Sequence, residues 1–333
     1  MRGSGKRNAC NGRIKDFRSL GPRKTLREIF EILNNFEFSP EFTAIRVPYG
    51  GNIFKKHTIS DKETIESLQK LASEAPIHIP PTIELAIELA LAAEKMPIVF
   101  IFETAFFCSL PEREAFYAVP RKISESLKLR RYGYHGIFHQ AAVEEGKKNK
   151  AERVISICLD ALPEIVAAIK GKPVFTTSGC TPLEGLPGRT TCGEIDPFIV
   201  TMLNKKLGLG PEEINRILSE ESGLRGITGK NKIDFPEIYL SNSPECILAK
   251  EIFEYRILKA CGSCVAAMGG VDMIVFSGKH HSLSEKIKEF ISKHLKIKES
   301  SEIEFVTCAD PLAKIMAEFA ETCIIANKLK TAK

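Results

Sequence analysis

The spacing of apolar and polar residues predicts an alternation of strands and helices along the chain. Ile98–Phe102 (IVFIF) is a short, continuous apolar run rich in β-branched and aromatic residues, which is typical of a strand buried on both faces. Val154–Leu159, Ile165–Ile169 and Met273–Phe276 have the same character. Strands that alternate with helices indicate an α/β protein with a largely parallel sheet in each half.

Between these runs, apolar residues recur at helical spacing. The segments expected to be helical are 23–34, 61–73, 82–95, 197–206, 211–219, 244–268, 283–294 and 312–328. Ser60 is expected to cap the second helix, and the pair Gly269 and Gly270 to end the helix over 244–268. Two further short strands are expected over 42–47 and 304–307.

Length and composition fit a globular protein. The 333 residues are 44% apolar and 27% charged, which excludes a disordered, collagen-like or low-complexity chain. The length suggests about two domains, and therefore a cleft between them. No apolar run reaches the ~20 residues needed to cross a bilayer, so no membrane partner is expected.

The net charge of +5 is concentrated at the N-terminus. Residues 1–27 contain nine basic residues and one acidic residue, so the rest of the chain carries −3. That body lacks the basic stripe that nucleic-acid binding requires. The basic segment could be a binding arm, a targeting signal or a ragged start; the absence of an amphipathic period and of a following apolar segment favours the ragged start.

The ten cysteines are scattered, and several lie in apolar runs. Without compact spacing they indicate reduced, mostly buried thiols of a cytoplasmic protein. Cys261 and Cys264 form one CxxC within a run of helical spacing, which favours helix packing over metal or redox chemistry.

Four sites of polar residues are candidates for chemistry, because ligands of open α/β sheets bind at the carboxyl ends of strands. Glu103 follows IVFIF directly, and Arg46 lies at the end of the strand over 42–47; each could also be a simple surface charge. His135 and His139 are four residues apart, but Gly136 interrupts the helix and no third metal ligand is visible. Arg189 lies in a loop rich in Gly and Pro.

Seven segments carry a resemblance when they are taken in order. They are IRVPYGG, EAPIHIPPTIE, VFIFETAFFCSLPEREAFYAVP, RRYGYHGIFHQ, TSGCTPLEGLPGRTTCGEIDP, ESGLRGITG and EYRILKACGSCVAAMGGVDMIVFSG. From about Thr43 to the C-terminus the chain resembles the acetokinase family, the acetate kinases, within the actin-like and sugar-kinase superfamily. Seven ordered blocks are far more specific than one short motif.

The resemblance implies an α/β fold of two actin-like, sugar-kinase-type domains, whose mixed, largely parallel sheets are flanked by helices on either side of a cleft. Residues 1–150 would form the first domain, without its first strand and completed by a C-terminal helix within 312–333; residues 151–311 would form the second. The implied reaction is phosphorylation of a short carboxylic acid by ATP with Mg²⁺, in a cytoplasmic homodimer.

The resemblance also implies roles for individual residues. Arg46 would pair with the carboxylate or the transferring phosphoryl group, His135 would donate to that phosphoryl group, and Glu103 would orient the acceptor or hold Mg²⁺, with Arg189 as a fourth catalytic residue. The acid pocket would be lined by Pro48, Ile77, Tyr134 and Pro182. The nucleotide would contact Asp234, Phe235 and Gly278.

The chain departs from the family pattern mainly on the nucleotide side. The opening strand with its Asn-Ala-Gly-Ser-Ser-Ser loop has no counterpart beyond Asn8, Ala9 and Cys10. The second phosphate loop, His-Leu-Gly-Asn-Gly-Ser in the family, is CLDALPE over 158–164, and its Pro163 has no N–H to donate. Thr191 and Pro236 stand where the family has Arg, and only Asp310 remains of an acidic Asn-Glu-Glu. Lys172, Lys279, His280 and His281 are the available substitutes.

Three readings therefore remain open: a divergent acetate kinase-type phosphotransferase with an eroded nucleotide side, a catalytically degenerate homologue that acts as a binding or regulatory protein, and a truncated reading frame whose true start supplies the missing strand.

Overall fold

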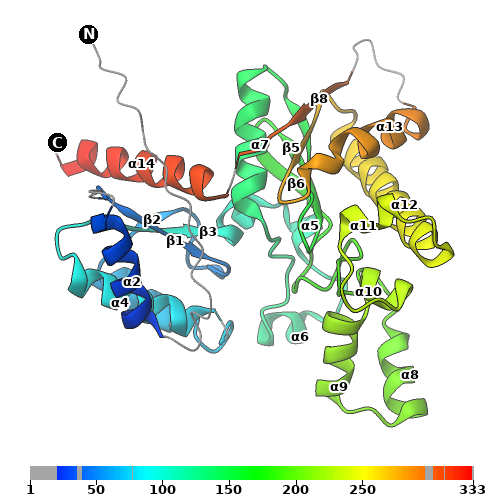
Figure 1. Cartoon of the computed structure of the whole chain (residues 1–333), viewed down its shortest axis with the longest axis horizontal. Coiled ribbons are helices and arrows are strands. Elements are labelled where there is room, and N and C mark those ends of the chain that lie inside the picture. The colour runs from blue at the N-terminus through cyan, green and yellow to red at the C-terminus, as the bar shows by residue number, and fades with distance from the viewer. Residues whose placement is uncertain (1–20, 36–39, 77, 297–302, 311, 332–333) are drawn as a thin grey trace.

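The computed structural model describes the chain apart from residues 1–20, 36–39, 77, 297–302, 311 and 332–333 (Figure 1). The expectations for most of the basic N-terminal segment, for Asn8 to Cys10 and for Ile77 lie outside the described residues. Within the described part, the strands form two sheets, the first on the left of Figure 1 and the second nearer its centre.

The first sheet has the order β1-β3-β2. Strands β1 (Thr43–Val47) and β3 (Ile98–Phe102) are parallel, and β2 (Thr58–Ile59) pairs with β3 antiparallel. All five residues of β3 are buried. Its two faces pack into different clusters, one with α2 (Pro22–Asn35) and α4 (Ile79–Ala92), the other with α14 (Leu312–Thr331). This two-sided cover explains the continuous apolar sequence of the strand.

The second sheet has the order β6-β5-β4-β7-β8. Its strands are β4 (Arg153–Cys158), β5 (Glu164–Ile169), β6 (Lys172–Thr176), β7 (Met273–Ser277) and β8 (Glu304–Thr307). Strands β4, β7 and β8 run parallel, whereas β4, β5 and β6 are joined by antiparallel pairs, so the sheet is mixed. The long helix α12 (Pro244–Met268) covers one face with the largest core cluster.

Helix α7 (Gly136–Lys148) connects the two halves of the molecule. It packs on β4 and β7 of the second sheet and also contacts β3 and α14 (Figure 1). Since Ile137 and Phe138 at its start belong to the cluster that includes Val99 and Ile315, the N-terminal end of α7 is held at the junction of both sheets.

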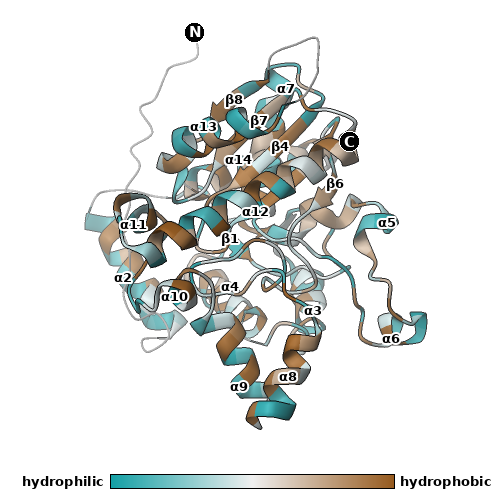
Figure 2. Ribbon diagram, turned by 90° about the vertical axis from the view of Figure 1, so that its right-hand side faces the viewer, coloured by the Kyte–Doolittle hydropathy of each residue, from teal (hydrophilic) through white to brown (hydrophobic). Residues whose placement is uncertain are grey.

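Shorter elements complete the fold. They are α3 (Lys62–Gln69), η1 (Glu103–Ser109), α5 (Glu112–Ala115), α6 (Arg121–Ser126), α8 (Phe198–Leu207), α9 (Pro211–Arg216), η2 (Ile217–Glu221), α10 (Gly223–Thr228), α11 (Phe235–Leu240), η3 (His281–Leu283) and α13 (Ser284–His294). Helices α8 and α9 project together from the body (Figures 1 and 2). Across the described ranges, no helix is long and apolar enough to cross a bilayer.

Most predicted elements are confirmed. The helix predicted over 244–268 has those bounds, and Gly269 ends it in the left-handed conformation with a φ of 70°. The prediction that Ser60 caps α3 is wrong, because Asp61 directly precedes the helix and its carboxylate accepts the Thr64 N–H at 2.7 Å. Strand β6 and helices α5, α6, α7, α10 and α11 were not predicted, because most of these are too short to show a period.

Candidate active site

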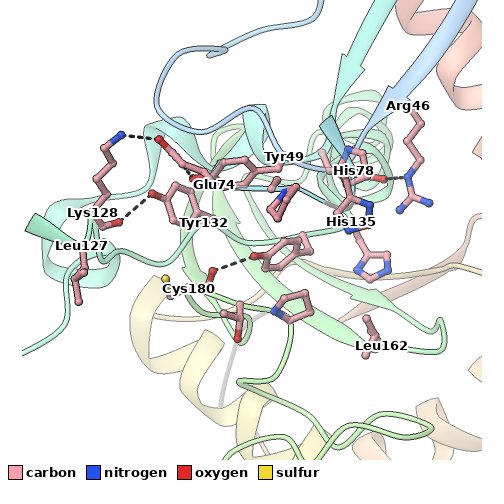
Figure 3. A pocket seen from close by; sticks show the side chains of 17 residues that line it. Arg46, Tyr49, Glu74, His78, Leu127, Lys128, Tyr132, His135, Leu162 and Cys180 are labelled. Atoms are coloured by element: carbon pink, nitrogen blue, oxygen red, sulfur yellow. Dashed lines mark hydrogen bonds and ion pairs between the residues drawn. The ribbon is translucent and has the colours of Figure 1, made fainter. Parts of the chain in front are cut away.

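A cavity of about 610 Å³ lies at the edge where the two sheets approach each other (Figure 3). It is lined by residues that follow β1 and β3, by the segment before α7, and by the loops after β4 and β6. The lining residues used below are Arg46, Pro48, Tyr49, Glu74, Glu103, Lys128, Tyr134, His135 and Pro182. This is the size range of small-molecule sites, and most of its exposed lining is apolar.

The parallel pairing of β1 with β3 brings Arg46 and Glu103 together. Arg46 lies opposite Ile101 in the register, so the carboxyl ends of both strands reach the same edge. Arg46 Nε donates to Glu103 Oε1 at 2.5 Å, and the Ile137 N–H donates to Oε2 at 3.1 Å. The Glu103 carboxylate therefore links β1, the end of β3 and the start of α7, while the Arg46 side chain remains 43% exposed.

Glycine is required at position 136 for this junction. A Cβ atom there would lie 1.9 Å from the Glu103 carbonyl oxygen. The preceding residue, His135, has a φ of 51°, a conformation that non-glycine residues rarely adopt. Such strain is found most often at functional sites and costs on the order of 1–3 kcal/mol.

Behind His135 lies Glu164, a carboxylate that sequence reasoning missed. Glu164 is fully buried; its oxygens accept the Tyr134 N–H at 3.0 and 3.1 Å, and Oε1 accepts the Thr176 hydroxyl at 2.8 Å. His135 Nδ1 and His139 Nε2 each lie 3.4 Å from Oε2. The only sequence signal was a charged residue at the start of the otherwise apolar strand β5.

The two histidines lower the pKa of Glu164, and Glu164 in turn raises the pKa of His135. Burial alone would raise the pKa of Glu164, but the neighbouring His135 and His139 outweigh it and lower the pKa to about 2. Burial likewise disfavours the His135 imidazolium, yet Glu164, followed by Glu103 and Asp160, raises the pKa of His135 above its usual range. Each charge is thus compensated by the other.

The predicted acid pocket is present in part. Pro48, Tyr134 and Pro182 line the cavity, whereas Ile77 is not among the described residues. The Tyr134 hydroxyl donates to the Cys180 carbonyl oxygen at 3.0 Å, so this polar group has a partner in the protein.

A further polar group in the cavity was not predicted. The Glu74 carboxylate accepts the Tyr49 hydroxyl at 2.8 Å and Lys128 Nζ at 2.5 Å (Figure 3). Tyr49 also packs edge-to-face on Tyr132, with ring centroids 5.1 Å apart. This end of the cavity is therefore polar.

Arg189 is not among the residues that line this cavity. Its loop is fixed by backbone contacts: the Arg189 N–H donates to the Ala161 carbonyl and its carbonyl accepts the Arg225 N–H. Its side chain is exposed, while Thr191, which stands where the family has Arg, is buried. The structure therefore brings together three of the four residues predicted to be catalytic.

The residues predicted to contact a nucleotide lie in the second half of the chain, outside the cavity lining. Asp234 caps α11 and pairs with Lys279 Nζ and His280 Nε2, each at 3.0 Å. Phe235 is buried against Phe253. Gly278 has a φ of 90° and lies so close to the Leu159 backbone that a Cβ would meet it at 2.6 Å.

The side chains described here do not form a direct Mg²⁺ site. No group of three or more His, Cys, Asp or Glu among them is arranged to hold a metal ion. Both oxygens of Glu103 have partners, and a metal on Oε1 would have to displace Arg46. His135 and His139 both face Glu164, so their spacing serves this carboxylate.

Comparisons with known proteins agree with this architecture. A family model described as the acetokinase family matches residues 14–330. The acetate kinase of Thermosipho africanus is 38% identical over 240 residues, covering 70% of this chain and 59% of that protein. That of Clostridium novyi is 33% identical over 340 residues, covering 94% of this chain and 83% of that protein. The chain thus spans about three fifths of the length of the first of these relatives.

A crystal structure of a propionate kinase from Francisella tularensis superposes with a TM-score of 0.79 at 27% identity, covering 89% of this chain and 83% of that chain. The expected fold, with mixed sheets flanked by helices in the actin-like, sugar-kinase arrangement, is confirmed.

Proposed function

Because this chain belongs to the acetokinase family, we propose that it is a phosphotransferase that uses ATP to phosphorylate a short carboxylic acid, giving ADP and an acyl phosphate. The observation that carries the proposal is the meeting of Arg46, Glu103 and His135 in one cavity with the apolar Pro48 and Pro182. Phosphoryl transfer asks a protein mainly to position its substrates and to place cationic donors around the transferring group.

Arg46 has the geometry for an anion clamp. Its Nε is bound to Glu103, and no described residue accepts a hydrogen bond from its Nη groups. In this proposal, these groups pair with the substrate carboxylate or with the phosphoryl oxygens, since guanidinium binds both in two-point fashion. Glu103 orients Arg46, and His135 donates to the phosphoryl group.

In the transfer, a carboxylate oxygen of the acid forms a bond to the γ-phosphorus, and the bond from that phosphorus to the bridging oxygen breaks. The electron pair of the broken bond leaves on ADP. No proton has to be removed from the acceptor, because a carboxylate is already ionised at neutral pH. The residues at the cavity therefore act by charge and position.

The remaining features of the proposal come from the family. ATP would arrive as its Mg²⁺ complex, with the nucleotide near Asp234, Phe235 and Gly278; Glu103 is not used as a metal ligand here. Residues 1–150 with 312–333 would form one domain and 151–311 the other, which the packing of α14 on β1 and β3 supports. We place the chain in the cytoplasm as a homodimer; the unpaired thiols of the described cysteines agree with a reducing compartment.

The test is a coupled assay for acyl phosphate with ATP, Mg²⁺ and acids of two to four carbons. We expect turnover that His135→Ala lowers by about 10² or more, as for loss of one preorganised donor. Equal rates for the two proteins at high enzyme concentration would exclude the activity.

A second candidate, a degenerate homologue that binds or regulates, is favoured by one observation. Lys279 and His280, the expected substitutes on the nucleotide side, both pair with Asp234, whose carboxylate would compete with phosphate for them. Calorimetry with ATP and Mg²⁺ separates the candidates: micromolar binding supports the kinase, and no binding at millimolar ATP supports the degenerate homologue.

A further inference from the structure

Glu164 is a buried carboxylate to which the proposed reaction assigns no role. It lies behind His135, is fully excluded from solvent, and has polar neighbours from the segment before α7, from α7 itself and from β6. A carboxylate in such a position is stable only if it is paired and hydrogen-bonded. The chain has therefore built a specific anionic site directly beneath the cavity.

The donors of this site leave little freedom for His139. Its Nδ1 lies 2.8 Å from the Ser156 hydroxyl, and its Nε2 lies 3.4 Å from Glu164 Oε2. Both ring nitrogens thus point to groups inside the protein, and the side chain is completely buried. A ring held in this way is a structural part of the carboxylate's surroundings.

His135 differs because it also lines the cavity. Its Nδ1 is buried and lies 3.4 Å from Glu164 Oε2, an ion-pair contact without the geometry of a hydrogen bond. The ring's other nitrogen, Nε2, is the one left for a cavity ligand. The strained φ of 51° at His135 and the glycine that follows fix the backbone from which the ring extends. The ring therefore connects the buried carboxylate to the substrate side.

We propose that Glu164 is a positioning residue that fixes the His135 ring with its Nδ1–H toward the carboxylate and holds the ring as an imidazolium, so that Nε2–H is a permanent cationic donor to the cavity. This inference rests on the proposed function, because it concerns the donor to the transferring phosphoryl group. Glu164 ends the segment CLDALPE, which stands where the family has its second phosphate loop. The backbone donors of that loop are therefore replaced here by a segment that places a carboxylate behind His135.

The other carboxylates near His135 also favour its protonated form, but each already has a hydrogen-bond partner. The titratable or charged groups that face it are Glu164 from β5, His139 from α7, Glu103 after β3, Asp160 before β5 and Arg46 from β1. Glu103 is paired with Arg46, and Asp160 accepts the Ala161 N–H. Glu164 is the carboxylate closest to the imidazole and is therefore the one whose removal matters most.

The experiment follows the protonation of His135 directly. Histidine-labelled full-length chain is titrated by ¹³C–¹H NMR, and the His135 signal is assigned by its loss in His135→Gln. We expect a titration midpoint above the ordinary value of about 6.5, and a decrease of about one pH unit or more in Glu164→Gln, a tenfold loss of proton affinity. Glu144→Gln, which removes an exposed carboxylate of the same helix α7, should leave the midpoint unchanged.

Two results would overturn the inference: a midpoint at or below about 6.5 in the unmodified chain, or a midpoint that Glu164→Gln leaves in place. The first arm does not use Glu164→Gln, so it decides even if that variant does not fold. The titration needs no turnover, so a chain with a raised midpoint and no acyl phosphate formation would lose the proposed function and keep this inference. A chain that forms acyl phosphate but shows an ordinary His135 midpoint would keep the proposed function and lose this inference.

Discussion

At the scale of single residues, the contact between Arg46 and Glu103 controls the donor that the proposed reaction needs most. Truncating Arg46 to Ala removes the guanidinium and leaves Glu103, which is 1% exposed, without its cation. We expect Arg46→Ala to lower kcat/KM for acyl phosphate formation by about 10²–10³. Arg46→Lys should recover little, because an ammonium group cannot hold Glu103 and an anion in fork geometry.

The matched control for Arg46 is Arg121→Ala. Arg121 also pairs with a carboxylate, that of Glu125 at 2.7 Å, but it is 91% exposed. Such surface pairs contribute little, so the rate should not change. A loss smaller than tenfold in Arg46→Ala would contradict the role given to this residue.

Glu164 makes stability depend on pH in the acid range. Its pKa is lowered from 4.5 to about 2, so its ionised form stabilises the fold above about pH 5 and this stabilisation is lost as the pH falls toward 2. The shift corresponds to on the order of 3 kcal/mol. In guanidinium unfolding, Glu164→Gln should be less stable than the unmodified chain at pH 7, and the difference should narrow toward pH 3. A difference that is constant with pH would show that Glu164 is not ionised in the fold.

The residues of the site were predictable to different degrees. Arg46 and Glu103 could be found because Arg46 lies at the end of one recognisable strand and Glu103 directly follows another, and the parallel pairing of these strands places both at one edge. Glu164 was missed because its burial depends on contacts with Tyr134, His139 and Thr176, which are distant in sequence and which no local pattern encodes. Arg189 was predicted to be catalytic because its loop resembles that of the family, yet the backbone contacts to Ala161 and Arg225 direct its side chain outward.

At the scale of elements, α14 gives the first sheet its second cover. Ile315, which is 5% exposed, packs with Val99 and Ile101 of β3. We expect Ile315→Ala to reduce the free energy of unfolding by about 2–4 kcal/mol, the usual cost of emptying a core site. Ile325→Ala on the same helix is the control, because Ile325 is 53% exposed. Equal effects of the two substitutions in denaturant unfolding would mean that α14 does not stabilise the sheet.

Helix α8 has apolar side chains but no buried residue. Phe198 and Leu207 are 61% and 66% exposed, and the helix projects from the body beside α9 (Figure 2). If the chain is a homodimer, this exposed apolar helix is the best candidate for the contact. In sedimentation velocity at micromolar concentration, Phe198→Asp with Leu207→Asp should yield monomers, and Leu240→Asp on α11 should remain dimeric. A dimer that survives the double substitution would place the contact elsewhere.

The elements themselves show what periodicity can and cannot predict. Helix α12 was found with its bounds because its length gives a clear period, a proline at the start and a glycine at the end. Helix α7 begins with a glycine that a propensity argument treats as a helix breaker. Packing against the Glu103 backbone requires that glycine. The intrinsic helix propensity of the sequence therefore predicts the wrong structure at this point of the site.

At the scale of the whole molecule, the two sheets contribute different residues to the described site. The first sheet supplies Arg46 and Glu103, and the second supplies Glu164 and the loop of Pro182. The division into two halves was predictable from length and from the alternation of strands and helices. Their relative position was not, because it depends on α7, whose contacts to both sheets are long-range.

Gly136 has a consequence for how this chain tolerates mutation. The residue has no side chain and is not part of the cavity lining, yet its Cα faces the Glu103 carbonyl at a distance that excludes a methyl group. A saturation scan should therefore score position 136 as intolerant as position 46, with alanine no better than tryptophan. Any substitution of this glycine would therefore inactivate the site even though every residue that lines the cavity is unchanged.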